Sequence, residues 1–279
     1  DVLVEGTHFR RDWSSAADIG HKAAAASLAD IAAMGGVATA LLVGFSASAD
    51  LPLDWALECA AGIAAEAAVV GACVVGGDVV ASPIVTVSVT VLGDMRGRTP
   101  VLRSGARPGD VVALAGRLGW SAAGLAMLSS GLSAPSTLVD AHRRPEPPYA
   151  AGPDAAAAGA TAMIDVSDGL VADARHLAEA SGVCVMLDTS AWVIAEPLAE
   201  AGLMMGVDPR EWMLEGGEDH GLLATFPADV AVPAPFLIIG SVAEVGSSES
   251  AGGFPDVIVN GMRREGPGGH VHFGGPITE

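Results

Sequence analysis

Residues 18–36 read DIGHKAAAASLADIAAMGG, an alanine-rich segment with Asp30 embedded among apolar residues. Asp18 is a typical N-cap and the Gly35-Gly36 pair a typical stop, so we predict a helix over 18–34. The density of alanine indicates that this helix packs closely against its neighbours. A carboxylate in such a setting is costly unless it has a partner or a function. The segment therefore predicts a packed helix that carries a chemically informative aspartate.

Helices and strands alternate on the C-terminal side of this segment. We predict a helix over 54–70, a short apolar strand over 73–75 that ends at Gly76-Gly77-Asp78, and a strand over 84–92. In the last of these, valine alternates with threonine and serine, which is the pattern of a half-buried strand. The valine face also offers an apolar surface through which two copies of the chain can form a dimer.

A change of composition separates two halves of the chain. Residues 93–109 are rich in Arg, Gly and Pro and lead into the turn sequence Arg107-Pro-Gly-Asp110. We therefore predict two domains, 1–100 and 101–279, of an α/β plus α+β class. In the second domain we expect helices over 121–130 and 167–180, a Pro- and Ala-rich connection over 139–158, and strands over 111–115, 162–166, 183–187, 221–226 and 236–239.

The composition excludes several classes of protein. The 279 residues are 51% hydrophobic and carry a net charge of −19, from 33 acidic against 14 basic side chains. This charge repels a phosphate backbone, and no basic patch in the sequence offsets it, so we expect no nucleic-acid partner. The longest charge-free runs are interrupted by glycine or proline and rich in small residues. We therefore expect no membrane span.

The lysine and cysteine content narrows the function further. Lys22 is the only lysine, and its Gly-His-Lys-Ala context does not form a Walker A loop. Metal ions and arginines would then have to neutralise any bound nucleotide. Cys59, Cys73 and Cys184 are widely spaced and match neither a zinc site nor a disulfide framework. This pattern favours a reducing cytoplasm.

Carboxylates in apolar or glycine-rich surroundings are the most informative residues of the sequence. They are Asp1, Glu5, Asp30, Asp78, Asp165, Asp168, Glu218 and Asp219. Mg²⁺ prefers oxygen ligands and usually combines one or two carboxylates with phosphates and water, so such a set suits a metal-nucleotide site. The alternative is that individual members cap helices or stabilise turns. Taken together, the set favours the metal interpretation.

Six motifs in order resemble a known family. They are DVLVEGTHF at 1–9, DIGHKAAAASLADIAAMGG at 18–36, VVGGD at 74–78, RSGARPGD at 103–110, MIDVSDGL at 163–170 and GGEDHGLLATF at 216–226. Along almost the whole chain, they resemble the thiamine-monophosphate kinase family. The resemblance implies a two-domain aminoimidazole-ribonucleotide synthetase-like fold, in which the N-terminal α/β sheet forms a homodimer and the second domain is α+β. It also implies a nucleotide site in a cleft that involves the dimer interface.

The same resemblance implies a reaction and its residues. The reaction is ATP-dependent phosphorylation of thiamine monophosphate to thiamine diphosphate, assisted by several Mg²⁺ ions. It needs no catalytic base, because the attacking phosphate oxygen is already anionic. The implied magnesium ligands are Asp1, Asp30, Asp78, Asp165 and Asp168. The implied ATP contacts are Gly77, Asp78, Arg103 and Ser167. The implied substrate contacts are His8, Glu218 and His270.

The chain departs from the family pattern at a few positions. His270 stands where the family usually has a bulky aromatic residue, and His220 stands where a tyrosine usually follows Gly-Gly-Glu-Asp. The family also has a Gly-Asp-Asp-Ala motif and a Ser/Thr pair upstream of the segment at Asp1, so we expect this sequence to be a fragment. Two alternatives stay open: another ATP-dependent enzyme of the same superfamily, and a non-catalytic metal-nucleotide binding protein.

Overall fold

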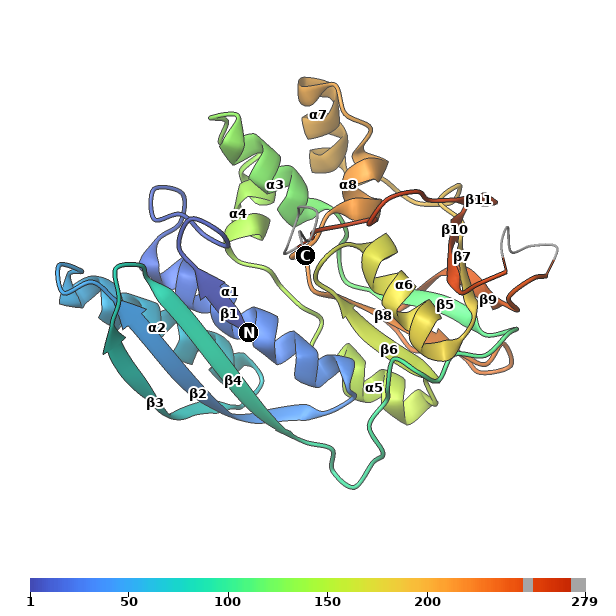
Figure 1. Cartoon of the computed structure of the whole chain (residues 1–279), viewed down its shortest axis with the longest axis horizontal. Coiled ribbons are helices and arrows are strands. Elements are labelled where there is room, and N and C mark those ends of the chain that lie inside the picture. Colours follow the sequence, from blue (N-terminus) through green and yellow to red (C-terminus); the bar gives the residue numbers. More distant parts are fainter. Residues whose placement is uncertain (248–252, 272–279) are drawn as a thin grey trace, which may run out of the picture.

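A computed structural model describes residues 1–247 and 253–271 of the chain. Within these ranges the strands form a four-stranded sheet in the first half and a seven-stranded sheet in the second (Figure 1). In spatial order, the first sheet contains β1 (Val2–Val4), β4 (Thr86–Asp94), β2 (Val37–Ala47) and β3 (Cys73–Ala81). The second contains β11 (Met262–Arg263), β10 (Asp256–Val259), β7 (Cys184–Leu187), β9 (Leu237–Ala243), β5 (Val111–Ala115), β8 (Gly221–Phe226) and β6 (Ala162–Val166).

Helices pack on both sheets. They are α1 (Ala16–Ala33), α2 (Leu53–Val69), α3 (Trp120–Ser129), α4 (Ser136–Arg143), α5 (Ala151–Ala158), α6 (Leu170–Ser181), α7 (Glu196–Met205) and α8 (Pro209–Glu215). The first two lie on one face of the four-stranded sheet (Figure 1). The mixed arrangement agrees with the predicted α/β plus α+β class.

The predicted first helix is confirmed, but its N-cap is Ser15 and not Asp18. Ser15 Oγ accepts a hydrogen bond from Asp18 N at 3.2 Å, and the Asp18 carboxylate accepts one from Ser15 N at 3.1 Å. This reciprocal capping box satisfies two N–H groups that the helix cannot pair internally. The helix therefore starts earlier than predicted, because Ser15 caps it first.

α1 and α2 approach each other backbone to backbone. A Cβ on Gly20 would lie 2.0 Å from Cys59 O, and a Cβ on Gly62 would lie 2.2 Å from Ala17 O. Such distances are far inside van der Waals contact, so only glycine fits at these two crossings. The close packing predicted from the alanine content is confirmed.

The two faces of the four-stranded sheet differ. Val85, Val87 and Val89 are 4%, 0% and 2% exposed, because they pack against helices of the same chain. Leu42 and Leu92, on the opposite face, are 42% and 54% exposed. The prediction that the valine face provides a dimer surface was therefore wrong. The exposed apolar side chains of the open face lie on the other side of the sheet.

β3 is longer and more exposed than predicted. Gly76, Gly77 and Asp78 lie in the middle of this nine-residue edge strand and do not end a buried strand. β3 runs parallel to β2, and the two strands come so close that a Cβ on Gly77 would lie 2.0 Å from Val43 O. The prediction that the strand ends at this glycine pair was therefore wrong, because the glycines allow a close approach between two strands.

The seven-stranded sheet holds the core of the second half. The predicted strands over 111–115, 162–166 and 221–226 are confirmed as β5, β6 and β8. α6 begins at Leu170, three residues later than predicted. Asp173 Oδ2 accepts hydrogen bonds from Asp168 N at 3.0 Å and from Gly169 N at 3.1 Å, which holds the preceding residues in a turn. The predicted connection over 139–158 contains most of α4 and all of α5.

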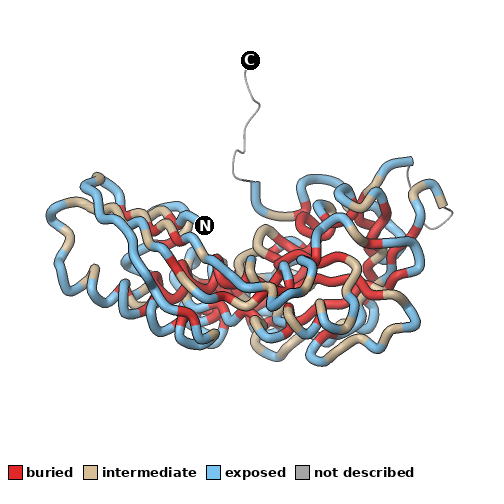
Figure 2. The backbone as a smooth tube through the Cα atoms, turned by 90° about the horizontal axis from the view of Figure 1, so that it is seen from below, coloured by how far each residue is buried: buried red, intermediate tan, exposed pale blue. Residues whose placement is uncertain are grey.

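The two halves meet along α1. A Cβ on Gly152 of α5 would lie 1.9 Å from Ala32 O, and Figure 2 shows buried segments where the halves join. The predicted domain boundary at 100/101 falls between β4 and β5 and stays a prediction. Residues 248–252 and 272–279 of the predicted second domain lie outside the described residues. Among the described helices, none combines the length and apolar character that crossing a bilayer requires.

Candidate active site

A cavity of about 820 Å³ lies between the two halves of the molecule. The start of the chain, α1, α3, α4 and the turns after β6 and before β8 all contribute to its lining. The predicted site residues in this lining are Asp1, His8, Ser167, Asp168, Glu218 and His270. Residues far apart in the sequence, predicted to bind metal, ATP and substrate, therefore share one cavity.

Asp165 and Asp30 lie beside this cavity. Asp165 is buried at the end of β6 and accepts a hydrogen bond from His220 Nδ1 at 3.2 Å. Burial lowers the pKa of His220, but the hydrogen bond and charge of Asp165, together with the charge of Glu218, outweigh it and raise the pKa overall. Asp30 is solvent-accessible near the end of α1, yet partial desolvation and the charge of Asp165 raise its pKa. Two predicted magnesium ligands are thus close enough to repel each other.

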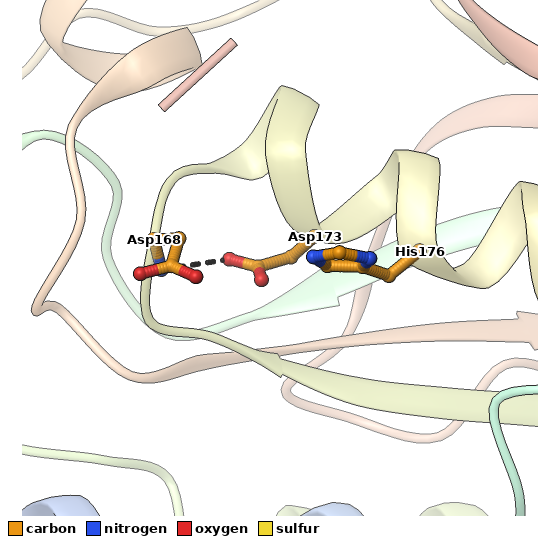
Figure 3. Close-up of side chains that lie close together, drawn as sticks. All are labelled: Asp168, Asp173 and His176. Atoms are coloured by element: carbon orange, nitrogen blue, oxygen red, sulfur yellow. Dashed lines mark hydrogen bonds between the residues drawn. The ribbon is translucent and has the colours of Figure 1, made fainter. Parts of the chain in front are cut away.

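The turn between β6 and α6 adds further carboxylates. Asp168, Asp173 and His176 each offer one possible ligand atom, and these atoms lie within 4.8 Å of one another (Figure 3). Burial raises the pKa of Asp173 to about 7, and the charges of Asp165 and Asp168 contribute to this shift. Hard oxygen donors whose charges repel one another are the donor set that a divalent cation stabilises. The carboxylates of Asp168 and Asp173 therefore fit Mg²⁺, whereas His176 offers a nitrogen.

The loop over 216–220 is tied to the turn after β6. Glu218 N donates to Ser167 O at 2.8 Å, and His220 N donates to Val166 O at 3.0 Å. Glu218 and His220 have φ values of +65° and +51°, in the left-handed region that non-glycine residues rarely occupy. Backbone strain of this kind often lies at functional sites, where surrounding contacts maintain it.

Glu218 pairs with Lys22 at the base of the cavity. Lys22 Nζ donates to Glu218 Oε2 at 2.7 Å and to His8 O at 3.3 Å. Burial raises the pKa of Glu218, but the charge and hydrogen bond of Lys22 together with the charges of His142 and His220 outweigh it and bring the pKa down to about 2. Burial, together with the charge of Lys22, lowers the pKa of His142 to about 4. Glu218 is therefore anionic near neutral pH, and His142 is neutral.

The sequence did not single out several residues of this cavity. Lys22, Ser121 and His142 line it, and Ser121 Oγ lies within hydrogen-bond distance of His142 Nδ1, at 3.1 Å. Asp173 was also missed, since an acidic residue in the first turn of a helix is commonplace. Of these residues, only Lys22 could have been singled out from the sequence, because a lone lysine followed by alanines is unusual in a helix.

Several predicted site residues do not line the cavity. Among the described residues, Asp30, Gly77, Asp78, Arg103 and Asp165 lie outside the lining of the cavity. Arg103 is near Asp30, whose pKa its positive charge lowers in part. Gly77 and Asp78 lie on β3, at the opposite edge of the four-stranded sheet from β1. Asp78 Oδ1 accepts a hydrogen bond from Val79 N at 2.9 Å.

Comparison with known proteins agrees with this geometry. The AIR synthase related protein family matches with its N-terminal domain over residues 1–95 and with its C-terminal domain over 107–234. Thiamine-monophosphate kinase of Mycobacterium tuberculosis H37Rv is 47% identical over 100% of this chain and 81% of its own length. The crystal structure of thiamine monophosphate kinase from Aquifex aeolicus has a TM-score of 0.86 and 32% identity, covering 95% of this chain and 88% of that one.

A second Aquifex structure, complexed with AMPPCP and TMP, has a TM-score of 0.85 and 33% identity over 98% of this chain and 85% of that one. The same family assignment follows from both halves of the fold, from the cavity between them and from the sequence identity along the whole chain. The chain belongs to the AIR synthase related family and, within it, to the thiamine-monophosphate kinases.

Proposed function

We propose that this chain transfers the γ-phosphoryl group of ATP to thiamine monophosphate, forming thiamine diphosphate and ADP. The observation that carries the proposal is the convergence of Asp1, His8, Ser167, Asp168, Glu218 and His270 on one cavity. A relative that is 33% identical was solved with AMPPCP and TMP, which supports the same pair of substrates.

For this reaction, the protein has to align the two phosphate groups and compensate their negative charge. The attacking group is a phosphate oxygen that is already anionic near neutral pH, so no side chain has to remove a proton. Mg²⁺, when bound, neutralises the negative charge of the two phosphate groups. We assign Asp1, Asp30, Asp165 and Asp168 to hold it, because they lie in or beside the cavity and fit its donor preference.

The substrates require different partners. We assign Ser167 and Arg103 to ATP, and His8 and His270 to thiamine monophosphate. Glu218 stays anionic and would repel a phosphate, so its natural partner is the cationic thiazolium ring or the exocyclic amine of thiamine. This refines the predicted role of Glu218 from substrate contact in general to contact with the thiamine moiety.

We also propose that the working unit is a homodimer whose interface includes the open face of the four-stranded sheet. Leu42 and Leu92 are exposed there, and Asp78 shares that face because it aligns with Gly44 and Ser88 across the sheet. Asp78 would then serve the site of the other subunit. A cytoplasmic location, expected from the cysteine pattern, remains part of the proposal.

Steady-state formation of thiamine diphosphate tests this function. Purified protein is incubated with ATP, Mg²⁺ and thiamine monophosphate, and the products are separated by chromatography. Asp30→Asn is the negative control, because it keeps the size of the side chain and removes its charge. We expect turnover in the wild type and at least about a 100-fold loss in the variant. No turnover in the folded wild type, or equal turnover in both proteins, would contradict the proposal.

A further inference from the structure

Lys22 lies inside the fold, although lysine is one of the residues least often buried. It is the only lysine in the chain, its exposed fraction is 4%, and alanines occupy the positions that follow it on α1. Removing an ammonium group from water is costly and needs a compensating partner. The groups that compensate the buried charge of Lys22 therefore indicate its role.

The ammonium group of Lys22 connects three segments. It belongs to α1, it donates to Glu218 Oε2 at 2.7 Å in the loop before β8, and it donates to His8 O at 3.3 Å in the loop after β1. The first and third of these segments lie in the first half of the fold, and the second lies in the other half. The contact therefore joins both halves at the base of the cavity.

The pair is asymmetric in exposure. The Lys22 side chain is 5% exposed, whereas the Glu218 side chain is 33% exposed and lines the cavity. Both residues line the cavity, but the carboxylate is by far the more exposed group of the pair and therefore the more accessible to a ligand. In the described part of the chain, the other ion-pair partner of Glu218 Oε2 is His142 Nδ1, at 3.7 Å, and the charge of His220 also acts on Glu218. Burial keeps His142 neutral near pH 7, so the compensating charge comes mainly from Lys22, with a smaller contribution from His220.

We propose that Lys22 is a positioning residue for substrate binding: its ammonium group holds Glu218 in a strained loop so that the carboxylate meets the thiamine moiety. The inference rests on the proposed function and deepens it. Stability alone does not explain the pair, because a buried ion pair is often no more stabilising than apolar side chains of the same volume. The backbone of Glu218 has a left-handed φ, and such a strained conformation persists only where surrounding contacts hold it, as the ion pair with Lys22 does here.

A double-mutant cycle tests whether Lys22 acts through Glu218. Lys22→Met keeps the apolar stem and removes the charge, and Glu218→Gln keeps the shape of its side chain and removes the charge. We expect each single variant to raise the KM for thiamine monophosphate about 10-fold or more, with the KM for ATP within about twofold of the wild type. We expect the KM increase of the double variant to fall clearly below the product of the two single increases, because either single variant already breaks the contact between Lys22 and Glu218.

Two results would overturn the proposal. One is a KM for thiamine monophosphate in Lys22→Met that equals the wild-type value. The other is a double variant whose increase in KM is the product of the two single increases, since Lys22 would then act independently of Glu218. Lys22→Met leaves the half-buried Glu218 carboxylate without its main cation and is the variant most at risk of misfolding. The double variant removes both charges and supplies the comparison in that case.

Tyr149→Phe is the matched control. Tyr149 OH donates to the buried carboxylate of Glu66 at 2.6 Å, a second contact that joins the halves but lies outside the cavity lining. We expect this variant to lose stability and keep both KM values; a matching rise in KM for thiamine monophosphate would assign the Lys22 effect to general loosening. Calorimetric binding of thiamine monophosphate with AMPPCP and Mg²⁺ repeats the cycle without turnover. A failure of the proposed kinase activity is thereby distinguished from a failure of this inference.

Discussion

Asp30 and Asp78 allow a test of whether each active site is built from two chains. Across the four-stranded sheet, Val2, Ser88, Gly44 and Asp78 form one row from β1 to β3. Three strand spacings separate the ends of this row, which is about 14 Å. Oxygen ligands lie about 2 Å from Mg²⁺, so Asp78 and the start of β1 in the same chain cannot share one ion.

In a dimer, Asp78 of the second chain can contribute to the cavity of the first chain, where Asp78 of the first chain is too distant. We expect Asp30→Asn and Asp78→Asn each to lose at least about 100-fold in activity. In a dimer made of one chain of each variant, one site carries both substitutions and the other carries neither. Random 1:1 reassembly gives mixed dimers in half of the cases, so activity should recover to about a quarter of the wild type.

The assay uses two affinity tags, one on each variant, so that mixed dimers can be purified and should show about half of wild-type turnover. Asp30→Asn mixed with Asp165→Asn is the control, because the charge of Asp165 acts on Asp30 within one chain. That pair should recover nothing if both residues serve the same site of the same chain. No recovery with Asp78→Asn, or equal recovery in the control, would refute the shared site.

Two further predictions concern stability. Gly62→Ala should lower the free energy of unfolding by about 1–3 kcal/mol, because the added Cβ would lie 2.2 Å from Ala17 O and force α1 and α2 apart. An unchanged midpoint of urea unfolding would argue against the close crossing of these two helices. Burial raises the pKa of Glu218, but Lys22, with His142 and His220, lowers it overall from 4.5 to about 2. The ionised Glu218 therefore stabilises the folded state above pH 4.5, and this stabilisation is lost as the pH falls towards 2. Glu218→Gln should therefore show a weaker loss of stability across that window in urea unfolding at graded pH, whereas an equal slope in both proteins would contradict the assigned pair.

The sequence predicted elements well where periodicity is local. The alternation over 84–92 corresponds to β4, and the apolar runs over 111–115 and 162–166 are strands without any shift of their bounds. The predictions were wrong where a tertiary or capping contact gives a residue a structural role that the local sequence does not indicate. Gly76-Gly77 resembles a turn, but it lies inside β3 because Val43 O comes close to Gly77. The helix over 18–34 was predicted with the wrong cap because Ser15 competes for that role.

The cavity residues were predictable only in part. Asp165 and Asp168 stand out because they flank a strand end, where a carboxylate is conspicuous. Lys22, Ser121 and His142 come together only through packing of α1, α3 and α4, and no spacing in the sequence signals that. Asp78 was predicted on the family pattern, and its place on the far edge strand becomes meaningful only with a second chain.

Direct transfer of a labelled phosphoryl group tests the central proposal most closely. In a single turnover with γ-labelled ATP, Mg²⁺ and thiamine monophosphate, the label should appear at the terminal phosphate of thiamine diphosphate, in equal amount to the ADP formed. Asp30→Asn should slow that appearance at least about 100-fold. Label released as inorganic phosphate, with thiamine monophosphate unchanged, would contradict the account.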